Sequence, residues 1–95
     1  APPAAAVLLA PVPNPFNPAV TVAFEIARTQ NVRLTVHDVR GHLVARLAEG
    51  PYAPGRHEVT WRGTEDGGSP APSGVYLVRL VGDDVLQTRR VTLVR

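Results

Sequence analysis

Ten prolines and eight glycines are spread along the chain, and they restrict its fold more than any other feature. Proline lacks a backbone donor and glycine is highly flexible, so both destabilise the interior of a helix. So many helix-breaking residues in a chain of this length argue against long helices. Apolar residues still make up 44% of the 95 residues, which is enough for the core of one small domain. We therefore expect short strands connected by turns.

Apolar and polar residues alternate with period two between these breakers. The pattern is clearest over Val20–Ile26, where Val22 and Phe24 share one parity. Such alternation is typical of a strand with one buried face. Similar patterns predict strands at Asn31–His37, His42–Ala48, Arg56–Trp61, Gly74–Val81 and Val85–Val94, with a possible short strand, Ala6–Leu9, in an Ala- and Pro-rich linker, 1–12.

Turn residues separate these strands. Asp38 and Gly41 stand first and fourth in a segment that is typical of a type I turn. Loops are predicted over Glu49–Gly55 and Gly63–Pro72, where Gly and Pro are frequent, and a tight hairpin turn is predicted at Gly82–Asp84.

About seven strands separated by short turns predict an all-β fold, an immunoglobulin-like antiparallel β-sandwich over residues 13–95. An open barrel is the alternative. Gly74–Val81 is apolar on both parities, so we expect this strand to be buried on both faces or central in its sheet. The expected core residues are Val22, Phe24, Leu34, Val36, Val59, Trp61 and Tyr76.

The charge and the absence of cysteine exclude several classes of site. The formal net charge is +2, all ten basic residues are Arg, and the only adjacent basic pair is Arg89–Arg90. Nucleic-acid binding usually needs a clustered basic stripe, so we expect no nucleic-acid partner. A chain without cysteine has no disulfide and no thiolate zinc site.

No residue pattern indicates catalysis or a cofactor. Ser69 and Ser73 lack the context of an activated nucleophile, and no Gly-rich phosphate loop precedes a helix. His37, Asp38 and His42 match no strong zinc spacing, so we expect no metal centre. The carboxylates that would be available to calcium lie in predicted turns: Glu65, Asp66, Asp83 and Asp84.

Five motifs occur in a recognisable order along residues 13–95. They are Pro13-Asn14-Pro15-Phe16-Asn17-Pro18, Val32-x-Leu34-x-Val36-x-Asp38-x-x-Gly41, Pro54-Gly55-x-His57-x-Val59-x-Trp61, Ser73-Gly74-Val75-Tyr76 and Arg90-Val91-Thr92-Leu93-Val94-Arg95. In this order they resemble the type A C-terminal sorting domain of proteins exported by the type IX secretion system. They are equally similar to the Ig-like domain first described in the flagellar hook-capping protein. Arg62 departs from the family, which often has Asp after its Trp, and Arg90 stands where Lys is frequent.

The resemblance implies a sorting role for the domain. It implies that the outer-membrane secretion machinery of a Gram-negative bacterium recognises the domain, which follows an N-terminal cargo domain. A sortase-like protease would then process the protein, which is released or attached to the cell surface. The chain opens at Ala1 without Met, so we expect it to derive from a larger protein.

The last two predicted strands are the expected recognition surface, with strand addition at an exposed edge as the mode of contact. Arginines in the final strand have a second interpretation, which is protection of a sheet edge against aggregation. The expected recognition residues are Gly74, Tyr76, Arg89, Arg90, Val91, Leu93, Val94 and Arg95.

The proline-rich segment Pro13–Pro18 is expected to stiffen the entry to the sandwich. Phe16 would fill one end of the core, and Asn14 and Asn17 would cap backbone groups in the turns. A role as a recognition surface is the alternative for this segment.

Two other functions remain open for the chain. One is a non-catalytic Ig-like structural module of an extracellular enzyme or a hook-type assembly. The other is a ligand-binding module, which would need an aromatic-lined groove. The chain has only five aromatic residues, and three of them stand on the parity expected to be buried.

Overall fold

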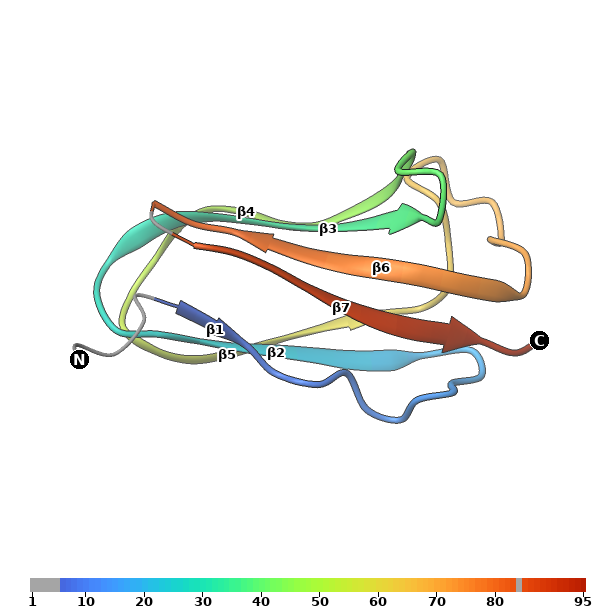
Figure 1. Cartoon of the computed structure of the whole chain (residues 1–95), viewed down its shortest axis with the longest axis horizontal. Coiled ribbons are helices and arrows are strands. Elements are labelled where there is room, and N and C mark those ends of the chain that lie inside the picture. The colour runs from blue at the N-terminus through green and yellow to red at the C-terminus, as the bar shows by residue number, and fades with distance from the viewer. Residues whose placement is uncertain (1–5, 84) are drawn as a thin grey trace.

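The computed structural model describes residues 6–83 and 85–95, which form two antiparallel sheets packed face to face (Figure 1). This arrangement confirms the predicted β-sandwich. The described part of the chain contains no helix with the length and apolar character needed to cross a membrane. The strands are β1 (Ala6–Leu8), β2 (Val20–Ile26), β3 (Gln30–Asp38), β4 (Leu43–Tyr52), β5 (Gly55–Trp61), β6 (Gly74–Val81) and β7 (Leu86–Leu93).

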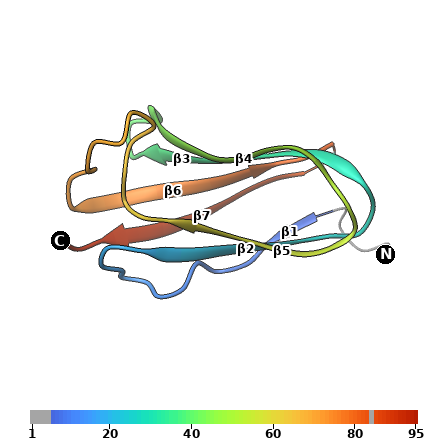
Figure 2. The ribbon, with the colours of Figure 1, turned by 180° about the vertical axis from the view of Figure 1, so that it is seen from behind.

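Three strands form one sheet and four strands form the other. The smaller sheet has the order β1-β2-β5 and the larger the order β4-β3-β6-β7 (Figure 2). Two separate sheets, each with two edge strands, contradict the open barrel. Consecutive strands β2 and β3 lie in different sheets, as do β4 and β5, so the chain passes back and forth across the core.

The core lies between the inner faces of the two sheets. Of the predicted core residues, all but one are at most 5% exposed: Val22, Phe24, Leu34, Val36, Trp61 and Tyr76. The remaining one, Val59, is half-buried and packs against the same cluster. Strand alternation in the sequence therefore identified the inward-facing parity correctly.

The predicted loop over Glu49–Gly55 is wrong. Strand β4 continues through Pro51, which pairs with Asn31, and β5 already begins at Gly55. β4 is an edge strand, and edge strands are the part of a sheet in which proline is tolerated.

The N-terminal segment belongs to the sandwich from Ala6 onward. Ala6 and Leu8 are at most 1% exposed and pair with β2, so the possible short strand predicted within this segment is present as β1. The first five residues of the predicted linker lie outside the described residues.

Strand β6 is central in its sheet, which explains why both of its parities are apolar. Tyr76, Val78 and Leu80 are buried in the core, while Val75 and Val81 reach the surface of the outer face. Burial on both faces, the other interpretation of this pattern, does not apply.

Candidate recognition surface

The proline-rich segment covers the outer edge of β7. Asn14 accepts a hydrogen bond at Oδ1 from the backbone N–H of Thr92 (3.0 Å) and donates from Nδ2 to the carbonyl of Arg90 (3.1 Å). Phe16 donates its N–H to Thr92 (2.9 Å) and accepts one from Val94 (2.9 Å). The side chain of Asn14 and the backbone of Phe16 thus bond the outward-facing backbone groups of β7, as a neighbouring strand would.

Phe16 also anchors the segment in the core. Its ring is 2% exposed and lies 5.4 Å from the Trp61 ring, centroid to centroid. The prediction that Phe16 fills one end of the core is confirmed. Asn14 bonds to backbone groups of strand β7 and not, as predicted, to those of its own turn. Asn17 remains exposed.

Polar side chains of β7 close the seam between the two sheets. Gln87 accepts a hydrogen bond from the N–H of Leu8 (2.7 Å) and donates one to the carbonyl of Ala6 (3.3 Å). The guanidinium of Arg89 donates to the carbonyl of Leu8 (3.0 Å). These bonds connect β1 in one sheet to β7 in the other without a backbone ladder between them.

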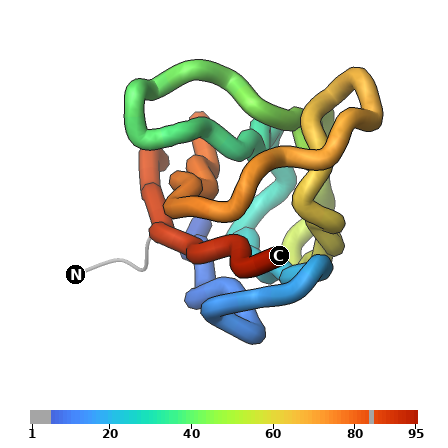
Figure 3. Tube along the Cα trace, turned by 90° about the vertical axis from the view of Figure 1, so that its right-hand side faces the viewer, coloured from blue at the N-terminus to red at the C-terminus, as the bar shows by residue number. Residues whose placement is uncertain are grey.

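The last residue is held by the loop between β5 and β6 at one end of the sandwich (Figure 3). The Arg95 backbone N–H donates to Ser73 Oγ (2.9 Å), and its guanidinium donates to the carbonyls of Ala71 (2.6 Å) and Gly63. Gly63 has φ of +71°, and an added Cβ would lie 3.2 Å from Leu93 Cδ2. The backbone conformation and this close approach both require glycine there.

Two aromatic side chains fix the loop that receives Arg95. Trp61 donates from Nε1 to the carbonyl of Thr64 (2.9 Å), and Tyr76 donates from its hydroxyl to Pro72 (2.6 Å). Burial raises the pKa of Tyr76, and the Glu65 charge adds to the effect. The hydroxyl therefore remains a protonated donor at neutral pH.

The predicted turn at Asp38 is present and strongly bonded. Gly41, with φ of +89°, donates its N–H to the Asp38 carbonyl (3.0 Å). Asp38 Oδ1 accepts the N–H groups of Arg40 (2.9 Å) and His42 (3.0 Å). The hydrogen bond from His42 is the main reason that the pKa of Asp38 is lowered.

The candidate metal ligands serve the fold instead. His37 bonds through one ring nitrogen to Thr35 Oγ1 (2.9 Å) and through the other to the Gly41 carbonyl (3.2 Å). Asp66 accepts the backbone N–H and the guanidinium of Arg46. Over 6–83 and 85–95, no group of three or more His, Asp or Glu side chains could hold a metal ion. Asp84, a candidate calcium ligand and part of the predicted hairpin turn, lies outside the described residues.

Sequence reasoning missed Gln30, which supports the β6–β7 hairpin. Its side chain is 4% exposed and accepts a hydrogen bond from the Asp83 N–H (3.1 Å). An added Cβ on Gly82 would lie 2.6 Å from Gln30 Oε1. A single polar residue at the start of a strand gives no pattern from which this distant contact could be predicted.

The eight predicted recognition residues fall into three groups. Tyr76, Val91 and Leu93 are at most 5% exposed, so their side chains are not accessible in the folded domain. Arg89 and Arg95 bond within the molecule, and Gly74 is half-buried. Four of the eight are exposed, and of these Arg90 and Val94 have side chains without a hydrogen bond among the described residues.

Strand addition along the last residues of β7 is incompatible with this structure. The backbone groups of Arg90, Thr92 and Val94 that point away from β6 are bonded to Asn14 and Phe16. A partner strand would first have to displace the proline-rich segment.

The FlgD Ig-like domain family matches residues 16–84 of the chain. No curated protein shows significant similarity to it. Among solved structures, dimeric latent PorU from Porphyromonas gingivalis aligns with a TM-score of 0.75 and 21% identity, over 94% of this chain and 9% of PorU. PorZ, a bacterial surface component of the type-IX secretion system of the same organism, aligns with a TM-score of 0.65 and 22% identity, over 93% of this chain and 11% of PorZ.

FlgD from P. aeruginosa is also similar, with a TM-score of 0.58 and 24% identity, over 78% of this chain and 61% of that protein. The chain therefore spans less than two thirds of each of these three proteins, and the likeness concerns the fold. Together with the family match, these similarities confirm the resemblance that the five motifs indicated. The chain belongs to the FlgD Ig-like domain family.

Proposed function

We propose that this domain is a sorting signal that directs a parent protein across the outer membrane by type IX secretion. The observation that carries the proposal is the likeness in fold to PorZ, a surface component of that system, over 93% of the chain. The ordered motifs support it, since they resemble those of type A sorting domains. The proposed outcome is release of the parent protein or its attachment to the cell surface.

The domain would act as a folded signal without chemistry of its own. Its partners would be the outer-membrane secretion machinery, the N-terminal cargo domain and a sortase-like processing protease. The bonds of Asp38, Tyr76 and Arg95 are directed at backbone groups of the same chain, which favours structural roles for these ionisable residues. This supports a non-catalytic role.

The signal would be a surface and not a linear stretch of residues. Side chains of the closing motif alternate between the core and the solvent, so only part of the motif is available to a receptor. Val94 is 48% exposed, and Arg90, four residues earlier with the same parity, is exposed as well, whereas Val91 and Leu93 lie in the core. We infer that the receptor recognises Arg90 and Val94 on the folded domain.

A reporter fusion tests the sorting role. Residues 1–95 are fused to the C-terminus of an inert periplasmic reporter in a bacterium with an intact type IX system and in a strain that lacks it. We expect the reporter at the surface or in the medium of the intact strain only. Retention in the periplasm of the intact strain, or equal export from both strains, would contradict the proposal.

Point variants locate the recognition surface more reliably than truncation. Deletion of Arg90–Arg95 should abolish export, but it also removes Val91 and Leu93 from the core. The double variant Arg90→Ala, Val94→Ser changes only exposed side chains, so the domain should remain folded while export falls. Arg56→Ala on the opposite sheet is the matched control. Equal export of the double variant and the control would exclude the surface at Arg90 and Val94.

The family match itself favours a second candidate, a structural Ig-like module of a larger assembly. Such a module would stabilise or space its neighbours and would carry no export information. In the same fusion experiment it would leave the reporter in the periplasm of both strains, although the domain is folded. The two functions are therefore distinguished by one measurement.

A further inference from the structure

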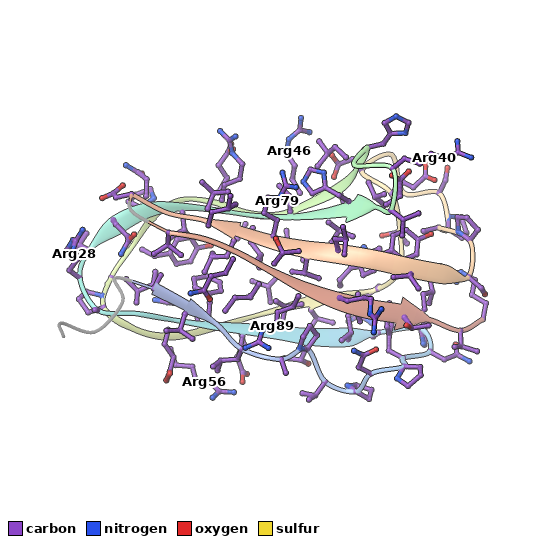
Figure 4. All side chains as sticks on the ribbon, in the orientation of Figure 1. Arg28, Arg40, Arg46, Arg56, Arg79 and Arg89 are labelled. Atoms are coloured by element: carbon purple, nitrogen blue, oxygen red, sulfur yellow. The ribbon has the colours of Figure 1, made fainter. Side chains whose placement is uncertain are left out.

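The outer face of the four-stranded sheet brings three arginines together. Thr35 on β3 pairs with Arg46 of β4 on one side and with Arg79 of β6 on the other. Neighbouring strands lie about 4.8 Å apart, so the two arginines flank Thr35 closely. Arg33 shares the parity of Thr35, two residues earlier on β3. Figure 4 shows Arg46 and Arg79 on the side of this sheet that faces away from the core, with Arg56 on the opposite sheet.

A shallow depression of about 410 Å³ lies among these arginines, and we call it the arginine groove. Leu43 and Val81, which are 43% and 36% exposed, contribute apolar surface to its lining. Leu86, 68% exposed, pairs with Val81 and extends this apolar surface onto β7. Val81 and Leu86 thus form a small exposed apolar pair at one end of the groove, and contiguous exposed apolar surface is typical of interaction sites.

The carboxylates near the groove leave one arginine unpaired. Arg33 Nε lies 2.8 Å from Glu49 Oε2, and Arg46 Nη1 lies 2.9 Å from Asp66 Oδ2. Arg79 has no ion pair or side-chain hydrogen bond within the part of the chain that the structure describes. Its guanidinium therefore keeps its full set of donors available to a ligand.

The polar groups between the arginines do not compete for that ligand. Thr35 is 5% exposed and its hydroxyl is bonded to His37, which uses its other ring nitrogen at Gly41. The exposed polar groups of the groove are therefore the guanidinium groups and the carboxylate of Glu49, which Arg33 already holds. The ion pairs of the guanidinium groups with Glu49 and Asp66 are exposed and thus weak, so an incoming carboxylate can share the same donors.

We propose that the arginine groove binds an acidic, amphipathic peptide segment of a partner protein. One carboxylate of the segment binds the guanidinium of Arg79, and an apolar side chain covers Val81 and Leu86. The two neighbouring arginines already hold carboxylates, which shows the chemistry that this face accepts. The apolar surface beside them favours a peptide over a purely ionic polymer such as polyphosphate, because a phosphate chain leaves that surface uncovered.

A titration of the 15N-labelled chain tests this proposal directly. The probe is the capped peptide acetyl-Glu-Leu-Glu-Asp-Leu-Glu-amide, compared at low salt with its Gln and Asn counterpart and with inorganic polyphosphate. We expect the acidic peptide to shift the amide signals of Arg33, Arg79, Val81 and Leu86, and the neutral peptide to leave them unchanged.

Variants of the same chain separate the two contacts. Arg79→Ala should weaken binding of the acidic peptide about tenfold, and Leu86→Ser should weaken it by a smaller factor. Arg56→Ala on the opposite sheet is the control and should have no effect. Arg79 is half-buried and Leu86 is exposed, so the folded spectrum should persist in each variant.

Four outcomes would overturn the proposal: no binding of the acidic peptide, equal binding of the neutral peptide, unchanged affinity in Arg79→Ala, or tighter binding of polyphosphate that is independent of Leu86. Concentration-dependent self-association that shifts the same signals would assign the face to a second copy of the chain instead. None of these outcomes depends on export of the reporter fusion, so this proposal and the sorting role can fail separately.

Discussion

The two faces of the larger sheet are built from the same strands, yet different forces hold their side chains. On the inner face, Leu34, Val36 and Val78 are fully buried, and the hydrophobic effect fixes their identity. On the outer face, Arg33 and Arg79 alternate with them along the same strands, and both reach the solvent. The inner face is thus committed to the fold, while the outer face can change without loss of the core and is free to serve a partner.

The largest effect is expected on the inner face. Leu34→Ala removes a fully buried side chain and should reduce the free energy of unfolding by about 2–5 kcal/mol. Arg33→Ala, one residue away on the outer face, loses one exposed ion pair and should cost about 0–1 kcal/mol. Urea denaturation of both variants measures the contrast. Similar losses would show that the outer face is as structural as the inner one.

Asn14 lies between these extremes because it is exposed and yet bonded to two backbone groups of β7. Asn14→Ala should cost about 1–2 kcal/mol. The amide of Thr92 should also exchange faster, since it loses its acceptor. Asn17→Ala is the matched control in the same segment and should do neither. An unchanged Thr92 exchange rate would show that water replaces the Asn14 contact without loss.

The strands were predictable because burial imposes a period of two on the sequence. Val20–Ile26 shows this alternation, and the inward parity of Trp61 follows from the same rule. The end of β4 was not predictable in this way, because Gly50 and Pro51 are typical of loops although an edge strand tolerates them. Alternation describes one strand at a time and contains no information about its neighbours.

The contacts between β1 and β7, and those of the proline-rich segment with β7, could not be predicted for the same reason. Gln87 and Leu8 are 79 positions apart, and nothing in either segment identifies the other as its partner. Asn14 was expected to cap backbone groups, but that these groups belong to β7 follows only from the fold. Most of the predicted recognition residues belong to two sequence motifs, but a motif does not show which side chains face the core. The structure therefore divides them into side chains that are buried, that bond within the molecule, or that are free on the surface.

The turn at Asp38 should make a smaller, pH-dependent contribution to stability. Its pKa in the folded state is lowered from 3.8, so the charged form stabilises the fold above the unfolded-state pKa. This contribution is lost as the pH falls through the folded-state pKa. Asp38→Asn keeps an acceptor oxygen but removes the charge. The difference in unfolding midpoint between wild type and variant should therefore be present at about pH 7 and shrink as the pH falls below 3.8. A difference that does not change with pH would show that the charge contributes nothing.

Arg79→Ala is expected to have the smallest effect on stability. This variant tests most directly whether the outer face of the sheet contributes to the fold. The adjacent Val78 is fully buried, so Val78→Ala should destabilise the domain, whereas the change at Arg79 should stay within about 0.5 kcal/mol. Thermal unfolding of the two variants provides the measurement. A loss of more than about 1 kcal/mol at Arg79 would mean that the fold itself uses the guanidinium or its aliphatic stem. A negligible loss, combined with weaker binding of the acidic peptide, would show that an arginine without a partner inside the molecule is available for one outside it.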